Sequence, residues 1–188
     1  VAQNINTATG GRVLGRDTKV IWGQSHIVEK LNGIEFAISP ESFFQVNSHQ
    51  GAVLGRLVTE YAGLEEGAKA LDCYCGTGSF ALHLGQKGAN VVGIEQVPSA
   101  INDAKANAER NGINSTSFRL GTVESILPGI LKEGPIDVAI VDPPRKGCEA
   151  EVLEALGEAR IPRLVYVSCN PSSLARDLAI LRDYGYTL

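Results

Sequence analysis

The order of hydrophobic and polar positions divides the chain into two sections. Before Pro40, short runs of alternating apolar and polar residues are separated by turn residues, a pattern typical of β-hairpins. Two hairpins are predicted, one around a turn at 16–18 and one around Asn32-Gly33, a dipeptide that favours a two-residue hairpin turn. Their strands are expected at 12–15, 19–22, 26–30 and 34–38. We therefore expect residues 1–40 to form a β-hairpin appendage.

After Pro40 the pattern changes. Apolar residues follow a helical spacing over 46–62, and from residue 68 onward short apolar runs alternate with helical spacings. Strands are expected at 70–71, 91–94, 116–120, 136–141 and 164–167, and helices at 80–86, 99–111, 123–131, 149–159 and 171–183. This alternation predicts an α/β fold: a doubly wound, mostly parallel sheet covered by helices on both faces. Residues 41–188 are expected to form this one domain.

Composition narrows the possible classes of protein. The 188 residues are 44% hydrophobic and 20% charged, which fits a folded domain and excludes a disordered chain. The formal net charge of −4 argues against a free-standing electrostatic nucleic-acid binder, so RNA contact would need a local patch or another domain. There is no apolar run that could span a membrane, and four cysteines are too few for a disulfide scaffold. We expect a cytoplasmic protein with no membrane partner. The chain lacks methionine even at position 1, which suggests a piece of a longer protein.

Ligands of doubly wound sheets bind at the carboxyl ends of the strands, so the residues that follow each strand matter most. The first such segment carries Tyr74, Gly76 and Gly78, whose glycines let the backbone approach a ligand closely. Glu95 ends the next strand, where this fold places an acid on a ribose diol. Ala81 replaces the third glycine of the dehydrogenase motif, which disfavours an NAD enzyme. The acid Asp72 ahead of the two glycines instead resembles the cofactor site of class I methyltransferases. Tyr74 is expected to lie against a flat ligand ring, and a purely structural turn is the less favoured alternative.

Two further strand ends carry reactive groups. Asp142 and Arg145 flank two prolines, which hold a rigid loop whose charges we expect to face the cleft rather than form a solvated surface pair. Cys169 precedes Asn170 and Pro171, an N-cap and a first helical position. A thiol at a helix N-terminus is favoured as thiolate, so we interpret Cys169 as a nucleophile rather than a small buried residue.

The other cysteines are expected to be packing residues. Cys73 and Cys75 straddle the glycine turn and point in alternating directions, and no second pair with zinc-site spacing accompanies them. Cys148 is interpreted as structural. No metal site is predicted.

Together these motifs resemble the RNA 5-methyluridine (uracil-C5) methyltransferases of bacterial tRNA and 23S rRNA. The resemblance rests on the glycine motif and on segments 42–47, 142–147 and 165–171, in this order. It implies that S-adenosylmethionine is the cofactor, contacted by Gln45, Tyr74, Glu95 and Asp142 beside Gly76 and Gly78. It also implies that Cys169 is the catalytic nucleophile. Thr122 departs from the family pattern, in which an acid near this position often binds the adenine.

The implied reaction is methyl transfer to C5 of a uridine in RNA through a covalent Cys169–C6 adduct, with a role in rRNA processing on 23S rRNA favoured over tRNA. In the family a glutamate beyond the last helix acts as the base, and an N-terminal β-barrel binds RNA. The resemblance therefore implies a fragment with a truncated C-terminal end. Two alternatives stay open: an RNA cytosine-C5 methyltransferase, which has cysteine where Arg145 stands, and a non-catalytic nucleotide- or RNA-binding module.

Overall fold

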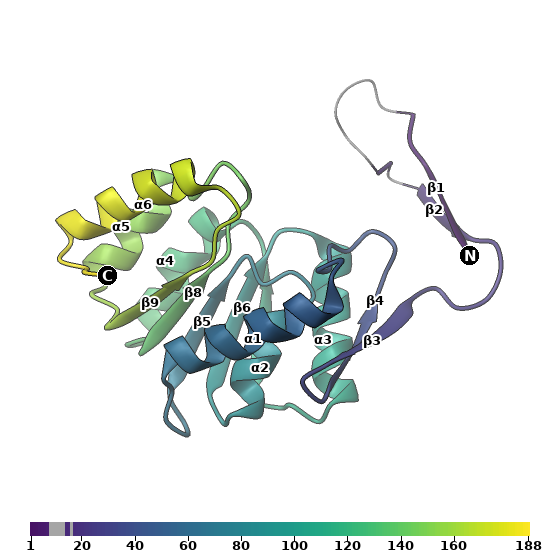
Figure 1. Ribbon diagram of the computed structural model, residues 1–188, viewed down its shortest axis with the longest axis horizontal. Helices are drawn as coiled ribbons and strands as arrows, with labels where there is room; N and C mark the ends of the chain where they lie inside the picture. Colours follow the sequence, from purple (N-terminus) through teal and green to yellow (C-terminus); the bar gives the residue numbers. More distant parts are fainter. Residues whose placement is uncertain (8–13, 16) are drawn as a thin grey trace.

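A five-stranded parallel sheet forms the centre of the protein (Figure 1). The computed structural model describes residues 1–7, 14, 15 and 17–188. The strands lie in the order β7-β6-β5-β8-β9, and every neighbouring pair is parallel. Their bounds are β5 (Lys69–Cys73), β6 (Asn90–Glu95), β7 (Thr116–Leu120), β8 (Val138–Val141) and β9 (Arg163–Tyr166). The order turns back at β5, as in doubly wound folds, which confirms the predicted α/β class.

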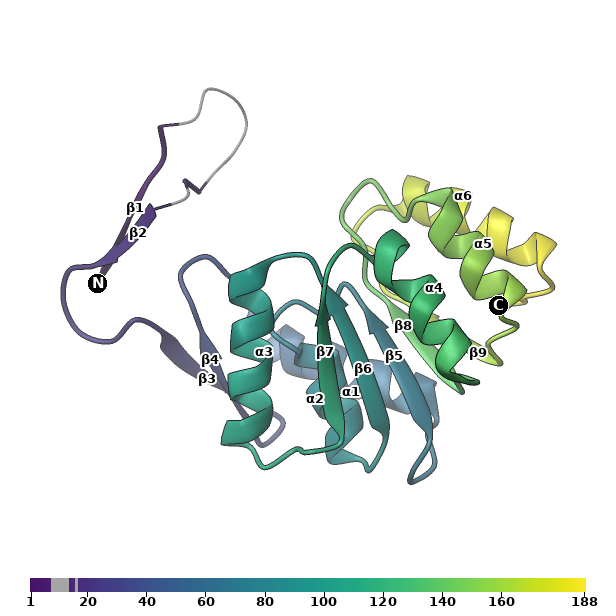
Figure 2. The same cartoon turned by 180° about the vertical axis from the view of Figure 1, so that it is seen from behind.

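In the described part of the chain, six helices cover the two faces of the sheet (Figures 1 and 2). One face carries α1 (Ser48–Ala62), α2 (Ser79–Gln86) and α3 (Pro98–Arg110), and the other carries α4 (Val123–Glu133), α5 (Ala150–Glu158) and α6 (Pro171–Asp183). Successive strand residues point to opposite faces, so Ala70 and Ile140 join the first core while Leu71 and Val141 join the second. This explains why the strands are apolar without alternation. Among the described residues, there is no helix long and apolar enough to cross a membrane.

The second predicted hairpin is confirmed. Strands β3 (Ile27–Leu31) and β4 (Ile34–Ile38) pair antiparallel around Asn32 and Gly33. Both turn residues have positive φ, 51° and 89°, as a type I′ turn requires.

The first predicted hairpin is wrong in its pairing. Strand β2 (Asp17–Val20) pairs with β1 (Ala2–Ile5), and Asp17 and Thr18 lie in the strand rather than in a turn. Part of the predicted 12–15 strand, and residue 16, lie outside the described residues. This two-stranded ribbon extends away from the sheet (Figure 1) and has no buried face, so hydrophobic alternation carries no information about its register.

The hairpin β3–β4 is packed onto the sheet domain. Its Ile34 and Phe36 are fully buried in the core that α1, α2 and α3 share with the sheet. Side chains four residues apart on α3 and at its C-cap also hydrogen bond alternate residues of β4 and the residue after it. Asn111 exchanges two bonds with the Glu35 backbone, Asn107 two with Ala37, and Asp103 accepts the Ser39 N–H. The edge of β4 is thus satisfied by a helix in place of another strand.

Candidate active site

The glycine loop after β5 is shaped by left-handed backbone. Tyr74, Gly76 and Gly78 have φ values of 65°, 54° and 84°. A Cβ on Gly78 would lie 3.2 Å from Ala104 and 3.3 Å from Phe118, so close packing as well as φ favours glycine there. A Cβ on Gly76 would meet no atom within 4 Å, which leaves the space above this residue open.

Glu95 lies beside this loop at the end of β6. One carboxylate oxygen accepts the Gly76 N–H at 3.1 Å, and the other accepts the Val97 N–H at 2.8 Å. A carboxylate can accept about four hydrogen bonds, so each oxygen keeps capacity for one more donor. The side chain is held in place by the backbone and is still able to bind a pair of hydroxyl groups.

Two more carboxylates lie at the same end of the sheet. Asp72 is completely buried; its Oδ2 accepts the Ala81 N–H at 2.8 Å, and its Oδ1 has no partner. Burial above all, and the nearby charges of Asp142 and Glu95, raise the pKa of Asp72 well above its ordinary value. Burial also raises the pKa of Asp142 to about 6. Three carboxyl groups in one place suit a ligand that is cationic or rich in hydrogen-bond donors.

A cavity of about 230 Å³ lies next to these groups. Tyr74 and Glu95 line it together with Thr122 and Glu124. Burial raises the pKa of Tyr74 far above its ordinary value, so the phenol keeps its proton. Glu124 places an acid in the cavity two residues after Thr122. Sequence reasoning missed Glu124, although an acid in the first turn of α4, shortly after β7, indicates a candidate ligand contact at this end of the sheet.

Gln45 is placed differently. It lines a separate cavity of about 510 Å³, together with Ile38, Phe44 and residues from the N-terminal segment. Its Cβ lies 3.3 Å from the position a Cβ on Gly51 would take, against the first turn of α1. Tyr74 and Glu95 thus line one cavity, with Gly76 hydrogen bonded to Glu95, whereas Gln45 lines another. The contact of Gln45 with a cofactor stays a prediction.

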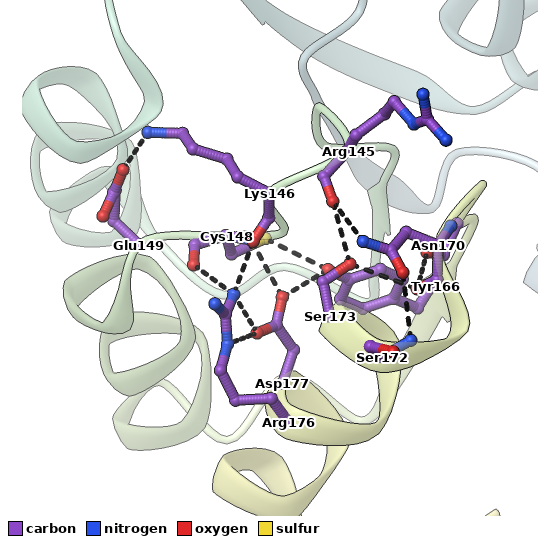
Figure 3. A network of polar contacts seen from close by, with 11 residues as sticks. Arg145, Lys146, Cys148, Glu149, Tyr166, Asn170, Ser172, Ser173, Arg176 and Asp177 are labelled. Atoms are coloured by element: carbon purple, nitrogen blue, oxygen red, sulfur yellow. Dashed lines mark hydrogen bonds and ion pairs between the residues drawn. The ribbon is translucent and has the colours of Figure 1, made fainter.

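Cys169 is the exposed member of four free cysteines. It lies in the loop between β9 and α6, three residues beyond the strand end rather than at it. Asn170 caps α6 by accepting the Ser172 N–H at 3.1 Å, as predicted. Its Nδ2 donates to the Arg145 carbonyl at 2.9 Å, and Ser173 donates to the same carbonyl at 3.2 Å (Figure 3). The Cys169 loop is therefore tied directly to the loop that begins at Asp142.

The sequence matches the family model described as tRNA (uracil-5-)-methyltransferase over residues 2–185. The chain belongs to this family. An RNA methyltransferase of Oceanobacillus iheyensis is 50% identical over 187 residues, and one of Clostridium tetani is 44% identical over 187 residues. Each match covers 99% of this chain and 41% of the relative, so the chain spans about two fifths of the length of these relatives.

Solved structures agree with the family. The Pyrococcus abyssi tRNA (uracil-54, C5)-methyltransferase, solved with S-adenosyl-L-homocysteine, is 34% identical with a TM-score of 0.79, over 94% of this chain and 43% of that one. A precorrin-6y C5,15-methyltransferase of Geobacter metallireducens, 14% identical, has a TM-score of 0.65 over 81% of this chain and 78% of that one. The latter likeness shows the fold alone.

In this uracil-5-methyltransferase family member the remaining cysteines have packing positions. Cys73 lies in the core under α4 and α5, and Cys75 lies in the core on the opposite face of the sheet. This confirms that the two side chains point in alternating directions. Cys148 is buried against Tyr166, whose hydroxyl lies 3.7 Å from its sulfur.

Proposed function

We propose that the protein transfers a methyl group from S-adenosylmethionine to C5 of a uridine in RNA, with Cys169 as the nucleophile. Family membership supports the reaction class. The observation that carries the proposal is the pair of hydrogen bonds from Asn170 and Ser173 to the Arg145 carbonyl. They hold an exposed thiol beside the end of the sheet where three carboxyl groups gather.

The residues at that end fit S-adenosylmethionine. Glu95 has two acceptor positions left for the ribose hydroxyls, and the carboxyl groups of Asp72 and Asp142 favour the positively charged sulfonium and ammonium groups. The buried Asp72 Oδ1, which has no hydrogen-bond partner among the described residues, supplies a further acceptor. Tyr74 and Glu124 line one cavity, and we expect them to contact a ring and its amino group there. When bound, S-adenosylmethionine supplies an electrophilic methyl group.

The part played by Cys169 follows from the low reactivity of uracil C5. The Cys169 thiolate forms a bond to C6, and the electron pair of the C5–C6 double bond moves toward C5 and O4. C5 is then nucleophilic enough to take the methyl group. A base must afterwards remove the C5 proton, and the electrons of that C–H bond re-form the double bond as Cys169 leaves.

The proposal also has to name the RNA that is methylated. The 23S rRNA preference stays a prediction, and the family description and the Pyrococcus relative are both named for tRNA. Four free thiols fit a reducing cytoplasm, which we propose as the compartment. Transcripts of tRNA and of 23S rRNA fragments, digested to nucleosides and measured by mass spectrometry for 5-methyluridine, would choose between the two.

A trapping experiment tests the covalent step. The chain is incubated with S-adenosylmethionine and an oligoribonucleotide that carries 5-fluorouridine. In this nucleoside fluorine replaces the C5 hydrogen, so the base has no proton to remove and the adduct is trapped. We expect a protein–RNA band on a denaturing gel that Cys169→Ser abolishes and Cys148→Ser preserves. An oligoribonucleotide with 5-fluorocytidine tests the cytosine alternative. A band that survives Cys169→Ser would refute the assignment of the nucleophile.

A further inference from the structure

A cluster of hydrogen bonds lies where α6 begins, shortly after Cys169 in the chain (Figure 3). Its centre is Asp177, which is completely buried although it follows the half-exposed Arg176. One carboxylate oxygen accepts the Cys148 N–H at 2.8 Å and the Tyr166 hydroxyl at 2.5 Å. The other accepts Arg176 Nε at 2.8 Å. Each hydrogen bond that a buried carboxylate accepts fixes the position of the donor group.

Most hydrogen bonds of this cluster reach the backbone of one short segment, 145–148, which directly follows the two prolines. Arg176 donates to the carbonyls of Lys146 and Cys148, at 2.8 Å and 3.3 Å. With the bonds to the Arg145 carbonyl and from the Cys148 N–H, three of the four residues of this segment are bonded through their backbone to the first two turns of α6. We call this arrangement the α6 clamp.

Gly147, the remaining residue of segment 145–148, shows how closely this segment approaches α6. A Cβ there would lie 2.4 Å from Arg176 Nη2 and 2.6 Å from Asp177 Oδ2, and the residue has a φ of 85°. Only glycine fits this position without displacing the clamp. The close contact means that the segment and α6 move together or not at all.

The Tyr166 hydroxyl completes the cluster from β9. Burial, and after it the hydrogen bond to Asp177, raise the pKa of Tyr166 far above its ordinary value, so this phenol stays a donor. One carboxylate thus connects the last strand, the segment after Asp142, and the helix whose N-cap follows Cys169.

We propose that Asp177 is a positioning residue, which sets the orientation of Cys169 relative to the Asp142 side of the cleft by joining α6 to segment 145–148. This inference rests on the proposed function. Addition to C6 needs an oriented thiol, whereas alkylation by a small reagent needs only an accessible one. We expect a loosened clamp to leave Cys169 less well oriented and more accessible, so that addition to C6 slows and alkylation speeds up.

The test compares three variants with the wild-type chain. Asp177→Asn keeps the volume but loses most of the acceptor capacity, and Tyr166→Phe removes a single donor. Asp183→Asn is the matched control, since Asp183 lies on the same helix, is 75% exposed and pairs only loosely with Arg182 at 3.8 Å. Four quantities are measured: the number of thiols that react with Ellman's reagent, the rate of Cys169 alkylation by iodoacetamide, S-adenosylhomocysteine affinity, and the rate of adduct formation with the 5-fluorouridine oligoribonucleotide.

For Asp177→Asn we expect one reactive thiol, as in the wild type, and an affinity for S-adenosylhomocysteine within threefold of the wild type. Alkylation of Cys169 should be at least threefold faster, and adduct formation at least tenfold slower. Tyr166→Phe should fall between it and the wild type, and Asp183→Asn should match the wild type. Adduct formation within twofold of the control would overturn the proposal. So would a loss of adduct accompanied by reaction of Cys148 or by lost affinity, because that pattern means a general structural role.

Failure of the proposed function is separable from failure of this inference. If the wild-type chain forms no adduct, this chain does not carry out the proposed covalent step, and the clamp is judged on iodoacetamide alone. A threefold rise in Cys169 alkylation for Asp177→Asn, with one reactive thiol, would then support the positioning role, and an unchanged rate would overturn it.

Discussion

Asp142 is expected to lower the stability of the chain at neutral pH, and replacing it should raise that stability. The carboxyl group is largely buried and makes no ion pair with Arg145 among the described residues. Burial disfavours its charged form, and Asp72, a second buried carboxyl, lies close enough for Asp142 to raise its pKa. Asp142→Asn removes the charge and keeps the shape of the side chain.

The size of the effect follows from the pKa. Burial raises the pKa of Asp142 from 3.8 to about 6, and one pKa unit corresponds to about 1.36 kcal/mol, so the ionised group costs the folded state about 3 kcal/mol. Because the folded pKa is raised, no cost exists below pH 3.8, where both states hold the proton. Stability is lost as the pH rises from 3.8 through about 6, and above that the full cost applies. Asp142→Asn should therefore stabilise the chain by up to about 3 kcal/mol at pH 7.5 and by almost nothing at pH 3.8.

Urea unfolding of the wild type and Asp142→Asn at several pH values between 3.8 and 7.5 measures this difference directly. Asp183→Asn, which removes an exposed carboxyl group, serves as the control and should show a small difference without this pH profile. Calorimetry on the same samples should show that Asp142→Asn weakens S-adenosylhomocysteine binding. A stability difference that stays flat with pH, or a variant less stable than the wild type at pH 7.5, would refute the reasoning.

Three more outcomes follow from the site and its supports. Glu95→Ala should weaken S-adenosylhomocysteine binding by about 1.5–3 kcal/mol in calorimetry, the usual scale for hydrogen bonds to a charged group, and unchanged affinity would contradict its assignment. Asn107→Ala should lower the free energy of unfolding by about 2–4 kcal/mol, because it leaves the N–H and carbonyl of Ala37 without their buried partners. Gly147→Ala should slow adduct formation with the 5-fluorouridine oligoribonucleotide, since its Cβ would displace Asp177; a wild-type rate would argue against the clamp.

The sheet and its helices were predictable because their signal is local and strong. The strand 116–120 and the helix 171–183 agree with the structure at both ends, since turn residues and the Asn170 cap mark their limits. The ribbon of β1 and β2 was not predictable, because neither of its faces is buried and its pairing depends on polar contacts such as Asn4 to Thr18.

The residues of the candidate site likewise include some that the sequence predicts and others that it does not. Tyr74, Glu95 and Asp142 could be placed at one end of the sheet from the sequence because each ends or directly follows a strand, and the topology of a doubly wound sheet brings strand ends together. Asp177 was missed because an Arg-Asp pair inside a helix looks like a solvated surface. Its burial comes from a segment 29 residues away in sequence, and only the folded chain reveals it.

The two kinds of buried carboxyl group in this fold have different roles, and their hydrogen bonds separate them. Asp177 has partners from three elements and therefore stabilises the arrangement around it. Among the described residues, Asp72 has one backbone partner and a buried oxygen with none, and the largely buried Asp142 makes no ion pair. A folded chain gains nothing from unpaired buried carboxyl groups. Their presence at the strand ends is explained if the missing donors and positive charge come from a ligand, which is the strongest structural reason to place the cofactor there.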